Sequence, residues 1–183
     1  MSSADSIFSS DPYLRRISKL TPLELSEIDS YLQLMLNQDN KLLNKTHYFN
    51  DRFENIYLKS TDHVLLNKLI DESMIYCAGL LKVDKSLLKI GYWFNLMNPG
   101  QVTTLHRHDD WDELISGVIY LQVPENSGDL VLYHDDQEIV LPPRLGNYIY
   151  FDPKTPHKVT KNQTSKHRLS IGMNIGLIAN DEE

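Results

Sequence analysis

The spacing of apolar residues in this 183-residue chain changes near residue 85, and the first part is mainly helical. Leu25, Ile28 and Leu32 recur at intervals that place them on one face of a helix. The segment Thr21-Pro22-Leu23-Glu24 comes just before them and combines an N-cap, a proline at the first helical position and a capping-box glutamate. It therefore predicts the start of this helix. A similar stripe predicts a second helix over about residues 61–81.

After residue 85 the pattern becomes one of short extended runs separated by turn residues such as Asn98-Pro99-Gly100 and Asp152-Pro153. Strands are predicted at residues 87–97, 102–108, 114–123, 129–134, 138–141, 147–151, 157–161 and 168–178. Residues 13–17 read as an early edge strand, and residues 42–60 have a mixed pattern that can hold short strands. Many short strands with Gly/Pro turns are typical of a jelly roll.

These elements predict a mainly β protein of the α+β class, with a double-stranded β-helix (jelly-roll, cupin-like) core. We expect a single domain over residues 1–183, because the length is that of one ordinary domain. Within it, residues 1–85 would form a helical support region and residues 86–178 the core.

Composition excludes some classes of partner. The formal net charge of −7 disfavours nucleic acid or an anionic membrane surface as the main partner, although a local basic patch is compatible with it. No apolar run approaches the ~20 residues of a transmembrane helix. The N-terminal residues show no signal-peptide pattern, and the single cysteine, Cys77, cannot form an internal disulfide. We therefore expect a cytoplasmic protein.

The chemistry concentrates in His106-Arg107-His108 and His157. Residues two apart on an extended segment point to the same face, so His106 and His108 can reach one ion. His157 begins a later predicted strand, and a jelly roll can bring such strands together at its open end. Imidazole is a common ligand of iron, zinc, copper and nickel, and three protein ligands leave positions free for other molecules.

The acidic residues that follow leave the ligand set open. Non-haem iron sites usually combine two histidines with one carboxylate, and Asp110 shares the face of the two histidines if the strand continues. Two sets therefore compete, His106/His108/His157 and His108/Asp110/His157. Trp111 lies in the same acidic loop, where it reads either as a substrate lid or as a hydrophobic residue packed on the barrel.

About residues 90–176 resemble the Fe(II)/2-oxoglutarate-dependent dioxygenases, in particular a small, mostly uncharacterised bacterial and phage-type branch. The similarity is carried by a series of motifs: Asn98-Pro99-Gly100, the His-x-His of residues 106–108, Ser116-Gly117-Val118-Ile119-Tyr120-Leu121, Ser127-Gly128, the run Pro143 to Phe151 followed by His157, and the closing Arg168-Leu169-Ser170.

The resemblance implies specific roles for these residues. His106 falls on the first iron ligand and His157 on the distal histidine, whereas His108 stands where the wider superfamily usually has an aspartate. This departure makes the ligand set neutral. Arg168 falls where the family binds the distal carboxylate of 2-oxoglutarate, and its planar fork suits a carboxylate. Ser170, and Tyr120 if it is not simply a core aromatic, would touch the same carboxylate.

The resemblance implies an Fe(II)-dependent oxygenase with 2-oxoglutarate and O2 as co-substrates. We expect a hydroxylase that couples 2-oxoglutarate decarboxylation to C–H oxidation. The substrate, a small molecule or a protein side chain, and the oligomeric state are not specified by the sequence. Two alternatives remain at this point: a cupin-type metalloenzyme that does not use 2-oxoglutarate, and a non-catalytic jelly-roll binding module.

Overall fold

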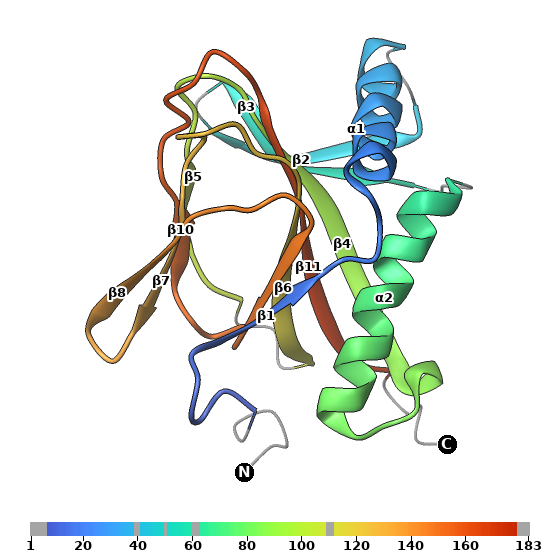
Figure 1. The fold of residues 1–183 in the computed structure, drawn as a ribbon, viewed down its shortest axis with the longest axis vertical. Helices are drawn as coiled ribbons and strands as arrows, with labels where there is room; N and C mark the ends of the chain where they lie inside the picture. The colour runs from blue at the N-terminus through green and yellow to red at the C-terminus, as the bar shows by residue number, and fades with distance from the viewer. Residues whose placement is uncertain (1–6, 39–40, 50, 60–62, 109–111, 179–183) are drawn as a thin grey trace.

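Two antiparallel sheets face each other, and two helices pack on the outside of the larger sheet (Figure 1). A computed structural model describes residues 7–38, 41–49, 51–59, 63–108 and 112–178. The larger sheet has seven strands in the order β1-β9-β6-β11-β4-β3-β2, and the smaller has four in the order β5-β10-β7-β8. This arrangement confirms the predicted mainly β fold with a jelly-roll core.

The helices are α1 (Pro22–Asn37) and α2 (Val64–Leu81), followed by a short 3₁₀ helix, η1 (Lys85–Leu87). The strands are β1 (Tyr13–Ile17), β2 (Leu43–Phe49), β3 (Arg52–Leu58), β4 (Leu88–Met97), β5 (Thr103–His106), β6 (Glu113–Gln122), β7 (Leu130–His134), β8 (Gln137–Leu141), β9 (Asn147–Phe151), β10 (His157–Val159) and β11 (Arg168–Leu177).

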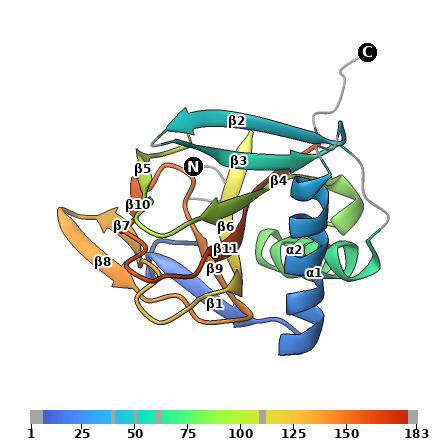
Figure 2. The same cartoon turned by 90° about the horizontal axis from the view of Figure 1, so that it is seen from above.

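The first 85 residues supply strands as well as helices. The predicted edge strand is β1, which pairs with β9, and the mixed segment 42–60 holds β2 and β3. Figure 2 shows β2 and β3 extending the larger sheet beyond β4. The N-terminal part therefore completes both edges of the sheet, in addition to the helical support that its apolar spacing predicts.

Local chemistry accounts for the two helix starts. Thr21 and Glu24 form the predicted capping box, in which the Glu24 backbone N–H donates to Thr21 Oγ1 at 3.3 Å and the Thr21 N–H donates to the Glu24 carboxylate at 2.7 Å. The second helix begins at Val64, later than predicted, because His63 acts as its N-cap and accepts from the Leu66 N–H.

The main core lies between the larger sheet and the helices. Fully buried leucines and isoleucines come from α1 and α2, including Ile28, Leu32, Leu66 and Leu69. Burying one such side chain contributes about 1.5–3 kcal/mol. A second, smaller cluster fills the space between the two sheets and contains Met97, Tyr120, Leu132 and Phe151 among others.

Strand β11 contributes side chains both to the helix-side core and to the interior of the barrel, because successive side chains of a strand point to opposite faces of the sheet. Leu169, Ile171, Met173 and Ile175 belong to the helix-side core. The residues between them face the space between the sheets, where Arg168, Ser170 and Asn174 are buried polar side chains. The middle of the protein therefore holds polar groups on a strand that the hydrophobic core keeps rigid.

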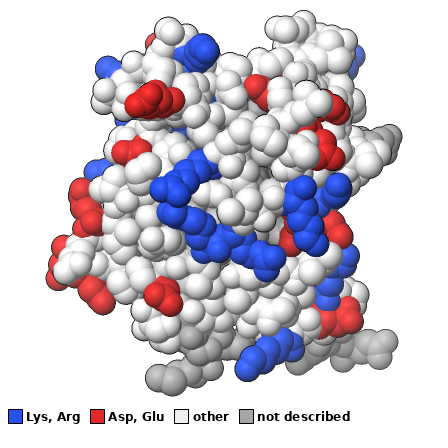
Figure 3. Space-filling model, in the orientation of Figure 1, with Lys and Arg blue, Asp and Glu red and all other residues white. Residues whose placement is uncertain are grey.

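The surface charge is not uniform. Figure 3 shows lysine and arginine side chains gathered across the middle of one face, although the chain carries a formal net charge of −7. Arg15 and Arg16 on the edge strand β1 are exposed. Among the described residues, neither helix combines the length and apolar character that crossing a membrane would need.

The contact between α2 and β9 gives a stability prediction. The Tyr148 hydroxyl donates to the Leu69 carbonyl oxygen at 2.8 Å and lies 3.2 Å from the Glu72 carboxylate. Tyr148→Phe should lower the free energy of unfolding by about 1–2 kcal/mol, because a buried hydrogen bond is lost without a change of shape. Urea unfolding measures this. Tyr48→Phe is the control, since that ring is 64% exposed and should change stability by less than about 0.5 kcal/mol.

Candidate functional site

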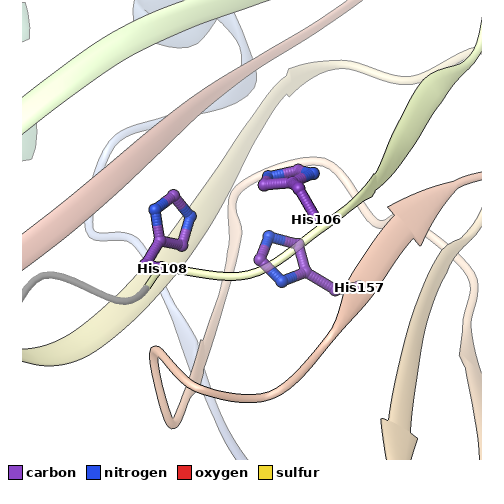
Figure 4. Close-up of side chains that lie close together, drawn as sticks. All are labelled: His106, His108 and His157. Atoms are coloured by element: carbon purple, nitrogen blue, oxygen red, sulfur yellow. The ribbon is translucent and has the colours of Figure 1, made fainter.

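Three histidine side chains meet in the space between the two sheets (Figure 4). His106 ends β5, and His157 begins β10 directly opposite it in the antiparallel register. His108 follows β5 by two residues, where its backbone N–H donates to the Pro153 carbonyl oxygen at 2.9 Å. One potential ligand nitrogen from each ring lies within 4.8 Å of the others. The structure thus brings together the histidines that the sequence analysis selected.

Backbone carbonyls fix the orientation of two of the rings. His106 Nδ1 lies 2.8 Å from the Thr104 oxygen, and His157 Nδ1 lies 2.9 Å from the Thr155 oxygen. A carbonyl oxygen can only accept, so each Nδ1 carries the hydrogen and each Nε2 keeps a lone pair. This is the tautomer that a metal-binding histidine needs when it coordinates through Nε2.

The electrostatics keep the deepest histidine neutral. Burial lowers the pKa of His157 to about 3, and the neighbouring His106 and His108 act in the same direction. A neutral imidazole is the form that binds a metal ion. His157 is therefore in the form that coordinates a cation at neutral pH.

His108 has side-chain neighbours in place of a backbone carbonyl. Its Nδ1 lies 3.0 Å from Asn174 Nδ2 and 3.8 Å from Glu113 Oε2. Its other ring nitrogen faces His106 and His157 (Figure 4). Glu113 is a residue that the sequence analysis did not single out, although it ends the acidic run after His108.

Arg168 lies in the same cavity and is 1% exposed. Its Nη1 is 3.3 Å from Ser170 Oγ and 3.5 Å from Met97 Sδ, and its guanidinium carbon lies 5.3 Å from the centre of the Tyr120 ring. Among the described residues, no carboxylate forms an ion pair with it, and its Nε has no hydrogen-bond partner. A buried cation in this state lacks a directly bound carboxylate.

The ionisation of Arg168 and Tyr120 also indicates that this part of the cavity binds an anion. Burial lowers the pKa of Arg168, whereas Tyr120 and Asp129 raise it. Burial raises the pKa of Tyr120, so its hydroxyl stays protonated, although Arg168 beside it acts in the opposite direction. Among the described residues, no group lies in hydrogen-bond geometry with this hydroxyl. Unused donors beside a buried guanidinium fit a bound carboxylate, which offers several acceptor sites.

Two connected spaces surround the histidines. A narrow inner cavity is lined by the three histidines together with Tyr120, Arg168 and Ser170. An open outer groove of about 570 Å³ shares His106 and His108 with it, and this volume is typical of ligand sites. Trp93 lies at the junction of both spaces, with its ring 5.9 Å from that of His108.

A buried polar network that the sequence analysis missed holds the strand before the histidines. Arg52 on β3 donates to the Val102 carbonyl at 2.8 Å and to Thr103 Oγ1 at 2.9 Å, and it forms an ion pair with Glu54 at 3.3 Å. Glu54 in turn accepts from the Thr104 N–H at 3.1 Å. Burial lowers the pKa of Arg52 to about 10. These contacts anchor β5, and so His106, to the N-terminal part of the chain.

The acidic loop after His108 is only partly described. Asp109, Asp110 and Trp111 lie outside the described residues, so the alternative ligand set with Asp110 and the expected lid at Trp111 stay predictions. Asp112 is described, and it forms an ion pair with Lys89 at the edge of the outer groove.

Comparison with known proteins points to one superfamily of oxygenases. Residues 92–176 match the sequence model of the 2OG-Fe(II) oxygenase superfamily. A Pseudomonas putida prolyl-4-hydroxylase is 18% identical, with a TM-score of 0.67 over 96% of this chain and 97% of that one. The epimerase SnoN from nogalamycin biosynthesis gives 13% identity and a TM-score of 0.72 over 94% and 79% of the two chains.

A viral collagen prolyl hydroxylase from Paramecium bursaria Chlorella virus-1 is 15% identical, with a TM-score of 0.63 over 93% of this chain and 98% of that one. No curated protein matches this sequence. At these identities the structural likeness concerns the fold, while the matched segment contains the His-x-His motif, the distal histidine and the arginine strand described above. Residues 92–176 thus carry the sequence pattern of the 2OG-Fe(II) oxygenase superfamily, whose members use Fe(II), 2-oxoglutarate and O2.

Proposed function

We propose that this protein is an Fe(II)- and 2-oxoglutarate-dependent hydroxylase with an all-histidine iron site. His106, His108 and His157 would bind Fe(II), and Arg168, Ser170 and Tyr120 would bind the far carboxylate of 2-oxoglutarate. Residues 86–178 then form the catalytic core, and residues 1–85 support it through the helices and through the Arg52 contacts to β5.

The observation that carries this proposal is a buried guanidinium that forms no direct ion pair with a described carboxylate and lies in the same cavity as three converging imidazoles. Leaving a charge buried and unpaired costs several kcal/mol, so the arrangement is favourable when an anion binds there. A dicarboxylate that chelates the metal through one end would place its other end toward Arg168 and Ser170. The residues present therefore fit both Fe(II) and 2-oxoglutarate.

When bound, Fe(II), 2-oxoglutarate and O2 would together supply oxidative decarboxylation to succinate and CO2 and the insertion of one oxygen atom into a C–H bond. The chain contributes orientation and charge. His106 and His157 present Nε2 because backbone carbonyls hold their Nδ1 hydrogens. Arg168 and the Tyr120 hydroxyl offer donors in a buried cavity, where electrostatic attraction is stronger than in water.

The two alternatives account for less of the site. A cupin-type enzyme that does not use 2-oxoglutarate has no need for Arg168 and Ser170 on the wall of the metal cavity. A binding module without a metal gives no reason for three imidazoles to converge. The position and burial of these residues therefore favour the oxygenase.

The substrate would occupy the outer groove, since that groove opens directly on His106 and His108. Trp93 forms one wall, and its place is set by Gly172 on the neighbouring strand, where an added Cβ would lie 2.7 Å from the indole ring. The groove takes a small molecule or a single side chain of a protein. The similar structures named above include prolyl hydroxylases and the epimerase SnoN from nogalamycin biosynthesis.

Loss of His157 tests the metal site. Anaerobic addition of Fe(II) and 2-oxoglutarate to the native protein should produce the weak visible charge-transfer band of the chelate, and His157→Ala should abolish it because one of three ligands is removed. His134→Ala is the matched control, since that histidine lies in β7 with its side chain 42% exposed. An undiminished band in His157→Ala would contradict the ligand assignment.

Loss of Arg168 tests the co-substrate site. Arg168→Met should weaken 2-oxoglutarate binding by about 2–5 kcal/mol, because the buried partner of the carboxylate is removed. Calorimetric titration of the anaerobic Fe(II) protein measures this. The same variant without ligand should be at least as stable as the native protein, since methionine removes a buried charge that has no direct ion-pair partner among the described residues. Arg144→Met changes an exposed arginine and should leave the affinity unaltered; equal affinities in all three proteins would refute the role of Arg168.

A further inference from the structure

We infer that Glu113 is a positioning residue that supplies the metal centre with the negative charge that its three neutral ligands lack. The inference rests on the proposed function and concerns the side of His108 that faces away from the other two histidines. In the wider superfamily an aspartate usually occupies the position of His108, and here a carboxylate stands directly behind that histidine.

The contacts around His108 form a connected polar group. Asn174 Nδ2 donates to Glu113 Oε1 at 2.7 Å and lies 3.0 Å from His108 Nδ1, while Ser116 Oγ donates to Asn174 Oδ1 at 2.8 Å. Glu113 Oε2 is 3.8 Å from His108 Nδ1, and both side chains are less than one-fifth exposed. Ser116 and Asn174 are buried, so this group is screened from bulk water.

Proton placement explains why the carboxylate is needed. A metal bound to Nε2 leaves the hydrogen of a neutral imidazole on Nδ1, and that hydrogen needs an acceptor. The amide NH2 of Asn174 lies 3.0 Å from Nδ1 and can only donate, so in this structure Nδ1 accepts from it, and a hydrogen on Nδ1 would need a different acceptor. The Glu113 carboxylate can accept that hydrogen, and closing its 3.8 Å separation to hydrogen-bond length requires a movement of about 1 Å.

A bulge in β6 aims Glu113 at this position. The register pairs Ser116 with Asn174 and Ile115 with Ile175, but the next residue of β11, Gly176, pairs with Glu113 and not with Leu114. Leu114 is the extra residue, and it packs with Ile115 against the helix-side core. Simple alternation would place Leu114 on the face of Ser116, so the bulge exchanges a leucine for a glutamate inside the barrel.

Gly176 makes this bulge possible. A Cβ at that position would lie 1.9 Å from the Asp112 carbonyl oxygen, a distance that only a glycine permits. The close approach of the two strands begins immediately before Glu113. The bulge therefore lies where the Glu113 side chain turns toward His108. Bulges beside active sites commonly redirect side chains in this way.

The first test compares two neighbouring carboxylates. Glu113→Gln keeps the size and the Asn174 contact but removes the charge, whereas Asp112→Asn removes the charge of an exposed residue that pairs with Lys89. Titration with Co(II) alone, followed through its visible absorption, gives the metal affinity without turnover. We expect Glu113→Gln to weaken Co(II) binding about 10- to 100-fold and Asp112→Asn to change it less than about twofold. Equal affinities in the two variants would overturn the inference.

The second test uses the His108→Asp background, in which the ligand brings its own charge. Glu113 then stands next to a like charge, so Glu113→Gln should leave Co(II) affinity unchanged or strengthen it. The same weakening in both backgrounds would indicate a general structural effect and would refute the inference. Absence of Co(II) and Fe(II) binding by the native protein would instead refute the proposed function, so the two failures are distinguishable.

Discussion

The pairing of β11 between β4 and β6 is the constraint on which the rest of the structure depends. One face of this strand anchors the helices through Ile171 and Ile175, and the other presents Arg168 and Asn174 to the space between the sheets. The apolar face holds the strand in place, so the polar face can be kept buried and rigid. The ten residues of β11 therefore contribute both to the stability of the core and to the site, and the site cannot move without disturbing the core.

The site divides its charges over two positions. In the proposed function, Arg168 provides a buried positive charge for the far end of a dicarboxylate, and the three imidazoles provide a place for a cation. The Glu113 carboxylate, set behind His108, offers the negative charge that a directly bound aspartate would otherwise bring. A charge that contacts a metal ligand, and not the metal itself, still affects the affinity for the metal, because the effective dielectric constant inside the barrel is low.

The N-terminal part of the chain is more closely connected to the site than its helical pattern indicates. Arg52 and Glu54 on β3 hold the backbone of residues 102–104, which lies immediately before His106. Neither residue belongs to a recognisable sequence motif, and both lie in residues 42–60, where the spacing of apolar residues is mixed. Sequence spacing could not reveal their role, because the contacts join residues about fifty positions apart and depend on the strand order.

The sequence by itself determined most of the strands, the start of the first helix and the identity of the principal side chains, because periodicity, capping and ligand chemistry are local properties. His106, His108, His157 and Arg168 were all identifiable in this way. Only the tertiary structure decided that Glu113 faces His108, because one extra residue in β6 reverses the side to which every preceding residue points. Such a bulge is set by pairing with a distant strand, which spacing along a single strand does not encode.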